Sequence, residues 1–212
     1  MAVRRRSRRR PIEPLAQSFD YPGGRADIWL ARLGDPAHDL APARAALARE
    51  LIARRARCAA DDVVLDRDPR GAPRIAAPAT ALRLSLAGRD DVVAAAVAGD
   101  PIGVDVEVIA APFEPPLHVL HPAERAVLET AGQGAYEIFL LLWTAKEAYV
   151  KALGAGLARE PREIEIRLAG AGGCGAFEVF DCGRRVPAAL AWTGRALVRQ
   201  RPVMLACFVA GR

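Results

Sequence analysis

The segment from Tyr136 to Leu153 most constrains how this chain folds. It is long enough for about five turns of α-helix, and its run of Ile, Phe, three Leu and Trp from residue 138 to 143 puts apolar side chains on nearly every face. A helix that is apolar nearly all round is buried, and glycine, here Gly154, commonly ends a helix. We therefore expect a helix over 136–153 that other elements cover on several sides.

Short strand-like segments make up much of the remainder. They alternate apolar and polar residues or are rich in β-branched residues between turn signals, and they lie at 26–33, 82–86, 91–98, 102–108, 164–168, 176–180 and 204–209. An alanine-, leucine- and arginine-rich segment at 41–59 predicts another helix. His121-Pro-Ala-Glu124 is typical of a helix start, with proline near the first position.

The order strand, helix, strands, helices, strands indicates an α+β fold. We expect two halves of similar size, residues 25–108 and 109–212, that meet near residue 109. Residues 1–24 are rich in Arg and Pro and are expected to form a disordered tail.

The positive charge of the chain is concentrated at its start. The formal net charge is +5, and six arginines stand among the first ten residues, so the remainder is close to neutral. A near-neutral body does not favour a nucleic-acid-binding domain. The tail is interpreted as a solvated leader, with an arm that touches RNA or anionic lipid as the alternative. Because no apolar stretch follows the arginines and no run approaches the ~18 apolar residues of a membrane helix, we expect neither a secretory signal nor a membrane segment.

The four cysteines do not form a recognisable site. Cys58, Cys174, Cys182 and Cys207 make no CxxC pair and have no zinc-like spacing with histidine. We expect free thiols in a reducing compartment and hence a cytoplasmic location.

Lysine is confined to one place in the sequence. Of 30 basic residues only Lys146 and Lys151 are lysines, and they flank Glu147 in the segment Trp143-Thr-Ala-Lys-Glu-Ala-Tyr-Val-Lys151. Lysine is a compact point charge and arginine a planar fork, so the two are not interchangeable. Chance is one explanation, and a site that requires ammonium groups is the other. Trp143, Glu147 and Lys151 follow one another at intervals of four and share a helix face.

A pair of carboxylates lies on one predicted strand. In Gly103-Val-Asp105-Val-Glu107 the two acidic side chains are two residues apart and point to the same face, while the valines point to the other. The pair is either a solvated edge with buried valines or a site for a hard cation such as Mg²⁺, which takes carboxylate oxygens. With Glu147 and the two lysines, the segments supply the groups that a metal ion and a diphosphate require.

These two motifs resemble those of the 4′-phosphopantetheinyl transferases of the long, surfactin-synthetase-activating type. That family has a GxDxE motif followed about 40 residues later by WxxKEAxxKxxG, and here Asp105 and Glu147 stand at this spacing. The resemblance extends over most of the chain from about Ala26. It implies two similar α+β halves related by a pseudo-twofold axis, with coenzyme A in the cleft between them, and a monomeric enzyme.

The resemblance also implies an activity and roles for individual residues. The enzyme would move phosphopantetheine from coenzyme A to a serine of an acyl or peptidyl carrier protein and release 3′,5′-ADP. Asp105, Glu107 and Glu147 would hold Mg²⁺, and Asp105, Lys146 and Lys151 would contact the coenzyme. Lys151 would assist the leaving group, and Glu147 or a water held by the metal would take the serine proton. The carrier would dock near the segment after Gly156.

The chain departs from the family where the nucleotide is anchored. The loop Gly71-Ala72-Pro73 lacks the family's lysine, and the strand end Ser85-Leu86-Ala87 keeps the first serine but lacks the histidine and the second serine. Arginine binds phosphate through its fork, so the residues expected to complete the coenzyme site are Arg44, Arg70, Arg74, Ser85 and Arg89. The alternative is a relative that binds coenzyme A or a carrier without turnover.

Overall fold

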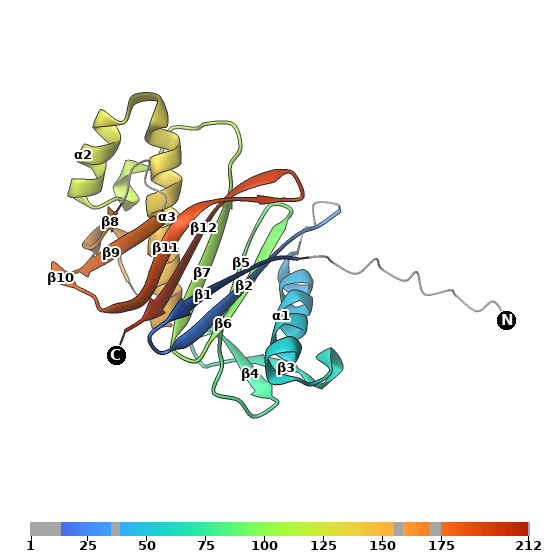
Figure 1. Ribbon diagram of the computed structural model, residues 1–212. Coiled ribbons are helices and arrows are strands. Elements are labelled where there is room, and N and C mark those ends of the chain that lie inside the picture. The colour runs from blue at the N-terminus through green and yellow to red at the C-terminus, as the bar shows by residue number, and fades with distance from the viewer. Residues whose placement is uncertain (1–13, 35–38, 155–158, 170–174, 212) are drawn as a thin grey trace.

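Two antiparallel sheets packed face to face form the centre of the molecule, as the computed structural model in Figure 1 shows. The structure describes residues 14–34, 39–154, 159–169 and 175–211. One helix covers the outer face of each sheet, so the layers run α1, first sheet, second sheet, α3. This is a mixed arrangement of helices and antiparallel strands, compatible with the expected α+β class.

The first sheet has the strand order β1-β2-β6-β5. Its strands are β1 (Leu15–Tyr21), β2 (Gly24–Arg32), β5 (Arg83–Arg89) and β6 (Val92–Ala98). β6 is buried along its whole length because successive side chains point to opposite faces that are both covered. Val93, Ala95 and Val97 pack toward α1 (Ala41–Ala56), while Ala94 and Ala96 pack toward the second sheet.

The second sheet follows the order β10-β9-β11-β12-β7, and β8 also pairs with β9. Its strands are β7 (Ile102–Val108), β8 (Ile164–Leu168), β9 (Gly175–Asp181), β10 (Arg184–Arg185), β11 (Ala188–Val198) and β12 (Arg201–Ala210). β12 alternates in the same way as β6. Leu205 and Cys207 face the first sheet, and Met204, Ala206 and Phe208 face α3 (Ala135–Leu153).

The remaining elements lie at the margins of these layers. α2 (Pro122–Thr130) begins with a capping box in which Glu124 accepts the backbone N–H of His121. Four short 3₁₀ helices and a two-stranded hairpin complete the described residues: η1 (Ala60–Asp62), η2 (Leu117–Val119), η3 (Gly132–Gly134), η5 (Pro161–Glu163), β3 (Val64–Arg67) and β4 (Pro73–Ala77). Among the described helices, none combines the length and the apolar character needed to cross a bilayer.

The edge strands β5 and β7 bring the two sheets together, and a hydrogen bond to the Ser85 side chain joins them. The hydroxyl oxygen of Ser85 on β5 accepts the backbone N–H of Val104 on β7 at 3.0 Å, and both groups are buried. β7 itself pairs with β12. The expected division after residue 108 therefore assigns to the first half a strand that is hydrogen-bonded into the second sheet.

The expectation of a disordered tail is wrong for residues 15–24. Residues 15–21 form β1, which pairs with β2 across the turn that precedes Gly24. Phe19 packs against Trp192 with ring centroids 5.3 Å apart, so this strand buries apolar surface that a tail would leave in water. Residues 1–13 lie outside the described residues, as does Cys174.

Candidate active site

Lys151 and Asp105 join the two sequence motifs in space. Lys151 lies near the end of α3 and Asp105 in the middle of β7, and the Lys151 ammonium donates to Asp105 Oδ1 at 2.6 Å. The Lys151 side chain is 30% exposed and that of Asp105 only 9%. The helix and the strand approach closely because residue 103 is a glycine, since a Cβ there would overlap the Ala148 carbonyl oxygen.

The expected alternation along β7 is confirmed. Val104 and Val106 are buried between the sheets, while Asp105 and Glu107 point to the other face. Glu107 Oε2 lies 3.2 Å from Nε of Arg89, at the end of β5. The neighbouring Trp143 side chain also acts to lower the pKa of Glu107. The strand thus presents two carboxylates that are each paired with a cation of the chain.

Glu147 forms an acidic group with Asp105 and Glu107, in which negative charges repel one another. Burial, and then the nearby Asp105 charge, raise the pKa of Glu147, and Lys151 partly offsets this. The same two causes raise the pKa of Glu107 to about 7, against the lowering effect of Arg89. Burial also raises the pKa of Asp105, although Lys151 opposes it. Buried like charges require a positive partner, or they take up protons.

The donor set suits a hard divalent cation. All three candidate ligands are carboxylates, the groups that Mg²⁺ prefers, and Asp105 Oδ2 is buried without a hydrogen-bond partner in the described part of the chain. The side chains are not gathered into a metal-ready group, however, because no cluster of three or more His, Cys, Asp or Glu in the described ranges has that arrangement. Lys151 and Arg89 neutralise two of the carboxylates instead.

Of the expected arginines, the structure brings Arg89 to the carboxylates. Arg44 on α1 lies beside the same end of β5. If residue 88 carried a Cβ, that atom would be 3.5 Å from the Arg44 side chain. Arg74 is held at the β3–β4 hairpin by Asp66 at 2.5 Å, and Arg70 lies in the hairpin turn. Within the described residues, neither hairpin arginine forms an ion pair with Asp105, Glu107 or Glu147. Their contact with a coenzyme stays a prediction.

Lys146 is placed differently from the expectation that it contacts a coenzyme. Its side chain is 1% exposed, and its ammonium lies 2.7 Å from Glu124 Oε2 and donates to the carbonyl oxygens of Pro161 and Ile164. Every hydrogen of the ammonium therefore has a partner inside the protein, and none is left for a ligand. The physical reason is that Lys146 and Lys151 lie five residues apart, so they leave the helix in different directions.

Glu124 is the residue that sequence reasoning missed. It caps α2, receives Lys146 and accepts the backbone N–H of Ile166 at 2.8 Å, and it is almost completely buried. Its place at a helix start was visible in the sequence, but nothing there indicated a buried ion pair. Ser85 is likewise engaged, by Val104, and its predicted coenzyme contact is not tested by this bond.

A cavity of about 320 Å³ opens beside Glu107. Arg89, Asp90 and Glu107 form its polar end, and the rest of its wall is mainly apolar or aromatic: Val108, Ala110, Phe113, Pro116, Val119, Tyr136, Phe139, Leu140 and Trp143. A mostly apolar cavity with a few convergent charges is typical of small-molecule sites.

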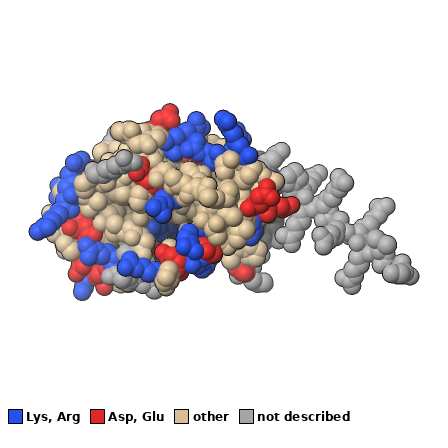
Figure 2. All heavy atoms as spheres, turned by 90° about the horizontal axis from the view of Figure 1, so that it is seen from below, with Lys and Arg blue, Asp and Glu red and all other residues tan. Residues whose placement is uncertain are grey.

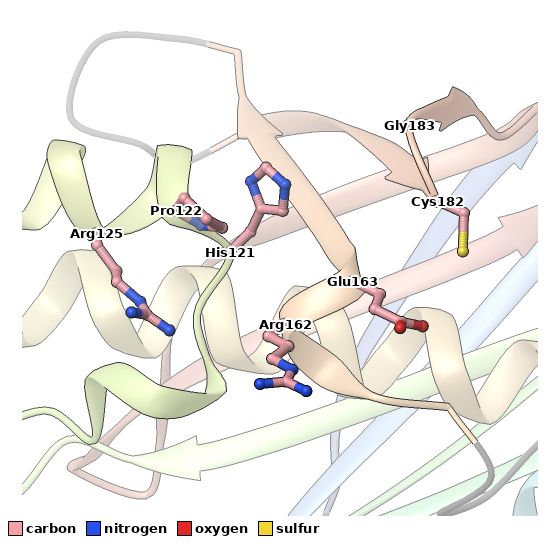
Figure 3. Close-up of a pocket in the computed structure, with 7 residues that line it drawn as sticks. All are labelled: His121, Pro122, Arg125, Arg162, Glu163, Cys182 and Gly183. Carbon is pink, nitrogen blue, oxygen red and sulfur yellow. The ribbon is translucent and has the colours of Figure 1, made fainter.

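A larger cavity of about 560 Å³ lies elsewhere, between the start of α2, η5 and the turn after β9 (Figure 3). His121, Arg125, Arg162, Glu163 and Cys182 line it, and it shares no residue with the carboxylate group. On the face in Figure 2, basic and acidic side chains are interspersed and do not separate into one large patch. The group of Asp105, Glu107 and Glu147, of which Glu107 borders the smaller cavity, remains the stronger candidate for chemistry.

Comparison with known proteins points to the same part of the chain. Residues 101–192 match the 4′-phosphopantetheinyl transferase superfamily. A search of curated proteins gave no match to this chain. The matched range includes β7 and α3, and with them Asp105, Glu107, Glu147 and Lys151.

Proposed function

We propose that this chain is a 4′-phosphopantetheinyl transferase of the long, surfactin-synthetase-activating type. It transfers 4′-phosphopantetheine from coenzyme A to a serine of an acyl or peptidyl carrier protein and releases 3′,5′-ADP. The observation that carries the proposal is the contact between Lys151 and Asp105, which joins the two motifs of the matched region at one site. The enzyme acts as a cytoplasmic monomer whose two halves are related by a pseudo-twofold axis.

The reaction requires a base and a group that accepts negative charge. The serine oxygen forms a bond to the phosphorus that bears pantetheine, while the bond from this phosphorus to the bridging oxygen of the nucleotide breaks. Glu147 is the base that accepts the serine proton, because a serine hydroxyl is a poor nucleophile until its proton is removed. Lys151, which is partly exposed, stabilises the negative charge that develops on the departing 3′,5′-ADP.

Asp105, Glu107 and Glu147 would hold a divalent cation, Mg²⁺ in the proposal. When bound, the ion supplies positive charge against the diphosphate. The partnerless Oδ2 of Asp105 and the raised pKa values of the three carboxyls support this assignment. Convergence of the three side chains requires Lys151 and Arg89 to move away from Asp105 and Glu107.

A non-catalytic relative that binds coenzyme A or a carrier is the second candidate. It is favoured by the strand end at β5, where the resembled family has polar groups and this chain has half-buried Leu86 and buried Ala87.

Mass spectrometry of an apo carrier protein separates the two candidates. The carrier is incubated with this chain, coenzyme A and Mg²⁺, beside Glu147→Gln and a control, Glu129→Gln, which changes an exposed residue of α2. A gain of one phosphopantetheine mass with the unchanged chain and the control, and its loss with Glu147→Gln, is the expected result. No gain on any of several carriers, with coenzyme A bound in a separate titration, identifies the non-catalytic relative.

A further inference from the structure

Arg89 is an exposed cation in contact with an enclosed carboxylate. Its side chain is 59% exposed, whereas that of Glu107 is 17% exposed, and the two are joined through Nε of the arginine at 3.2 Å. An arginine held this way keeps most of its guanidinium donors available to another acceptor, because five N–H groups are present and the fork is planar.

The backbone that carries Arg89 is fixed, so its side chain moves from a defined base. Arg89 pairs with Val92 in the β5–β6 ladder, and the next residue, Asp90, has a φ of +51° in the tight turn. Asp90 lies 3.9 Å from Arg89, but it also lies 3.7 Å from Arg201 on β12. If Arg89 swings away, Asp90 keeps a positive neighbour, so the movement leaves only the Glu107 carboxylate without its cation.

A destination for the guanidinium lies next to its present position. Arg89 and Glu107 both border the 320 Å³ cavity, and Arg44 lies over Gly88, the residue before Arg89. The free donors of the Arg89 guanidinium provide the planar, multiple-donor surface that recognises phosphate. An anion bound there and a cation on Glu107 would each replace one half of the Arg89–Glu107 pair.

We propose that Arg89 is an exchangeable counter-ion of the site: it neutralises Glu107 when the site is empty and transfers to a phosphate group of the ligand when a divalent cation takes its place on Glu107. The inference rests on the proposed location of the site but not on transferase activity. It means that cation and phosphate bind cooperatively, because each releases the partner that the other requires.

If Arg89 exchanges in this way, replacing it should strengthen the binding of the cation and weaken the binding of the phosphate. Arg89→Gln removes the competitor for Glu107, so Mn²⁺ alone binds severalfold more tightly. The same change removes a phosphate donor, so inorganic pyrophosphate alone binds about tenfold more weakly. Arg83→Gln is the matched control, because Arg83 is exposed on the same strand at its other end and carries the same charge.

Isothermal titration with Mn²⁺ and with pyrophosphate, each alone and then in the presence of the other, tests the proposal. The unchanged chain and Arg83→Gln are expected to bind each probe more tightly when the other is present. Arg89→Gln is expected to reduce this cooperativity to the part that comes from direct attraction between Mn²⁺ and pyrophosphate, which free Mn²⁺–pyrophosphate titrated without protein measures. The proposal is overturned, and the Arg89–Glu107 pair is static, if Arg89→Gln weakens or does not change Mn²⁺ binding. It is also overturned if the cooperativity of Arg89→Gln equals that of Arg83→Gln. Because neither probe requires a carrier, a negative transfer assay would count against the proposed function alone.

Discussion

Gly103 on β7 lies so close to Ala148 on α3 that no side chain fits between them. A Cβ at this position would overlap the Ala148 carbonyl oxygen and come within 2.7 Å of the Ala152 nitrogen, and both are backbone atoms that cannot rotate away. The contact sets the spacing between the strand that carries Asp105 and the helix that carries Lys151. The glycine of the first motif is thus explained by packing.

Gly103→Ala is expected to destabilise the protein by about 3 kcal/mol or more, at the upper end of what overpacking costs. Urea denaturation measures this directly. Gly99→Ala is the control, because among the described residues outside its chain neighbours a Cβ there meets only the Tyr21 hydroxyl oxygen, at 4.0 Å. Equal stabilities for the two variants would contradict the close approach of α3 and β7.

Removing one partner of the buried Lys146–Glu124 pair is expected to be severe. Lys146→Met leaves Glu124 buried without its cation and the carbonyls of Pro161 and Ile164 without a donor, at a cost of about 3–5 kcal/mol. The double change Lys146→Met with Glu124→Gln should cost less than the sum of the single changes, as a double-mutant cycle in urea would show. Additive effects would mean that the two charges are not coupled.

The ionised Asp181 carboxylate is expected to stabilise the folded protein, and this stabilisation should be lost in acid. Its burial favours the neutral acid, but hydrogen bonds from Arg159 and Tyr149 outweigh burial and hold the pKa of Asp181 below its usual value. A lowered folded-state pKa stabilises the protein above the unfolded pKa, near 4, and this contribution disappears as the pH falls through the folded value.

Asp181→Asn should therefore lower the free energy of unfolding by about 1–3 kcal/mol at pH 7. The difference from the unchanged chain should shrink below pH 4. Thermal melts between pH 2.5 and pH 7 measure it, with the exposed Asp61→Asn as control. A difference that does not vary with pH would show that the Asp181 charge contributes nothing.

The Glu107 carboxyl is expected to make the protein less stable as the pH rises, which is opposite to the effect of Asp181. Its pKa is raised to about 7, so without a metal ion the folded state favours the protonated carboxyl and loses stability as the pH rises through that value. The melting temperature of the metal-free chain should fall by roughly 3 °C between pH 6 and pH 8, a shift that corresponds to about 1 kcal/mol. Glu107→Gln should remove this part of the slope.

Mg²⁺ should reverse the sign of the Glu107 effect. A cation bound to the carboxylates favours their ionised forms, so Mg²⁺ should raise the melting temperature more at pH 8 than at pH 6. Chelation with EDTA should restore the original slope. A Mg²⁺ effect that is the same at both pH values, or that is undiminished in Glu107→Gln, would place the ion elsewhere.

Local patterns in the sequence predict much of this fold. The helix at 136–153 is observed as Ala135–Leu153 and ends at Gly154, and the strands expected at 91–98 and 102–108 appear as β6 and β7. β1 was missed because Pro and Arg around it are typical of a tail, and β11 because four of its eleven residues are alanine, which has a low strand propensity. Their pairing partners, β2 and β12, decide their structure, and pairing between strands is not a property of the segment alone.

The site shows the same division between local and long-range information. The faces of Asp105 and Glu107 follow from the two-residue period of a strand, and the face of Lys151 follows from the helical period. The burial of Lys146 depends on Glu124, which is 22 positions earlier, and on carbonyls of η5 and β8. No sequence period connects these elements, so the sequence did not show that Lys146 is used up inside the protein.

The two lysines of α3 hold one helix at two separate points. Lys146 anchors it to α2 and to the chain around η5, and Lys151 anchors it to β7. Sliding the helix along its axis, or turning it, strains both attachments at once. A ligand that draws Lys151 away from Asp105 would leave the contact between Lys146 and Glu124 in place. The backbone of α3 would therefore stay where it is, and only side chains would move at the site.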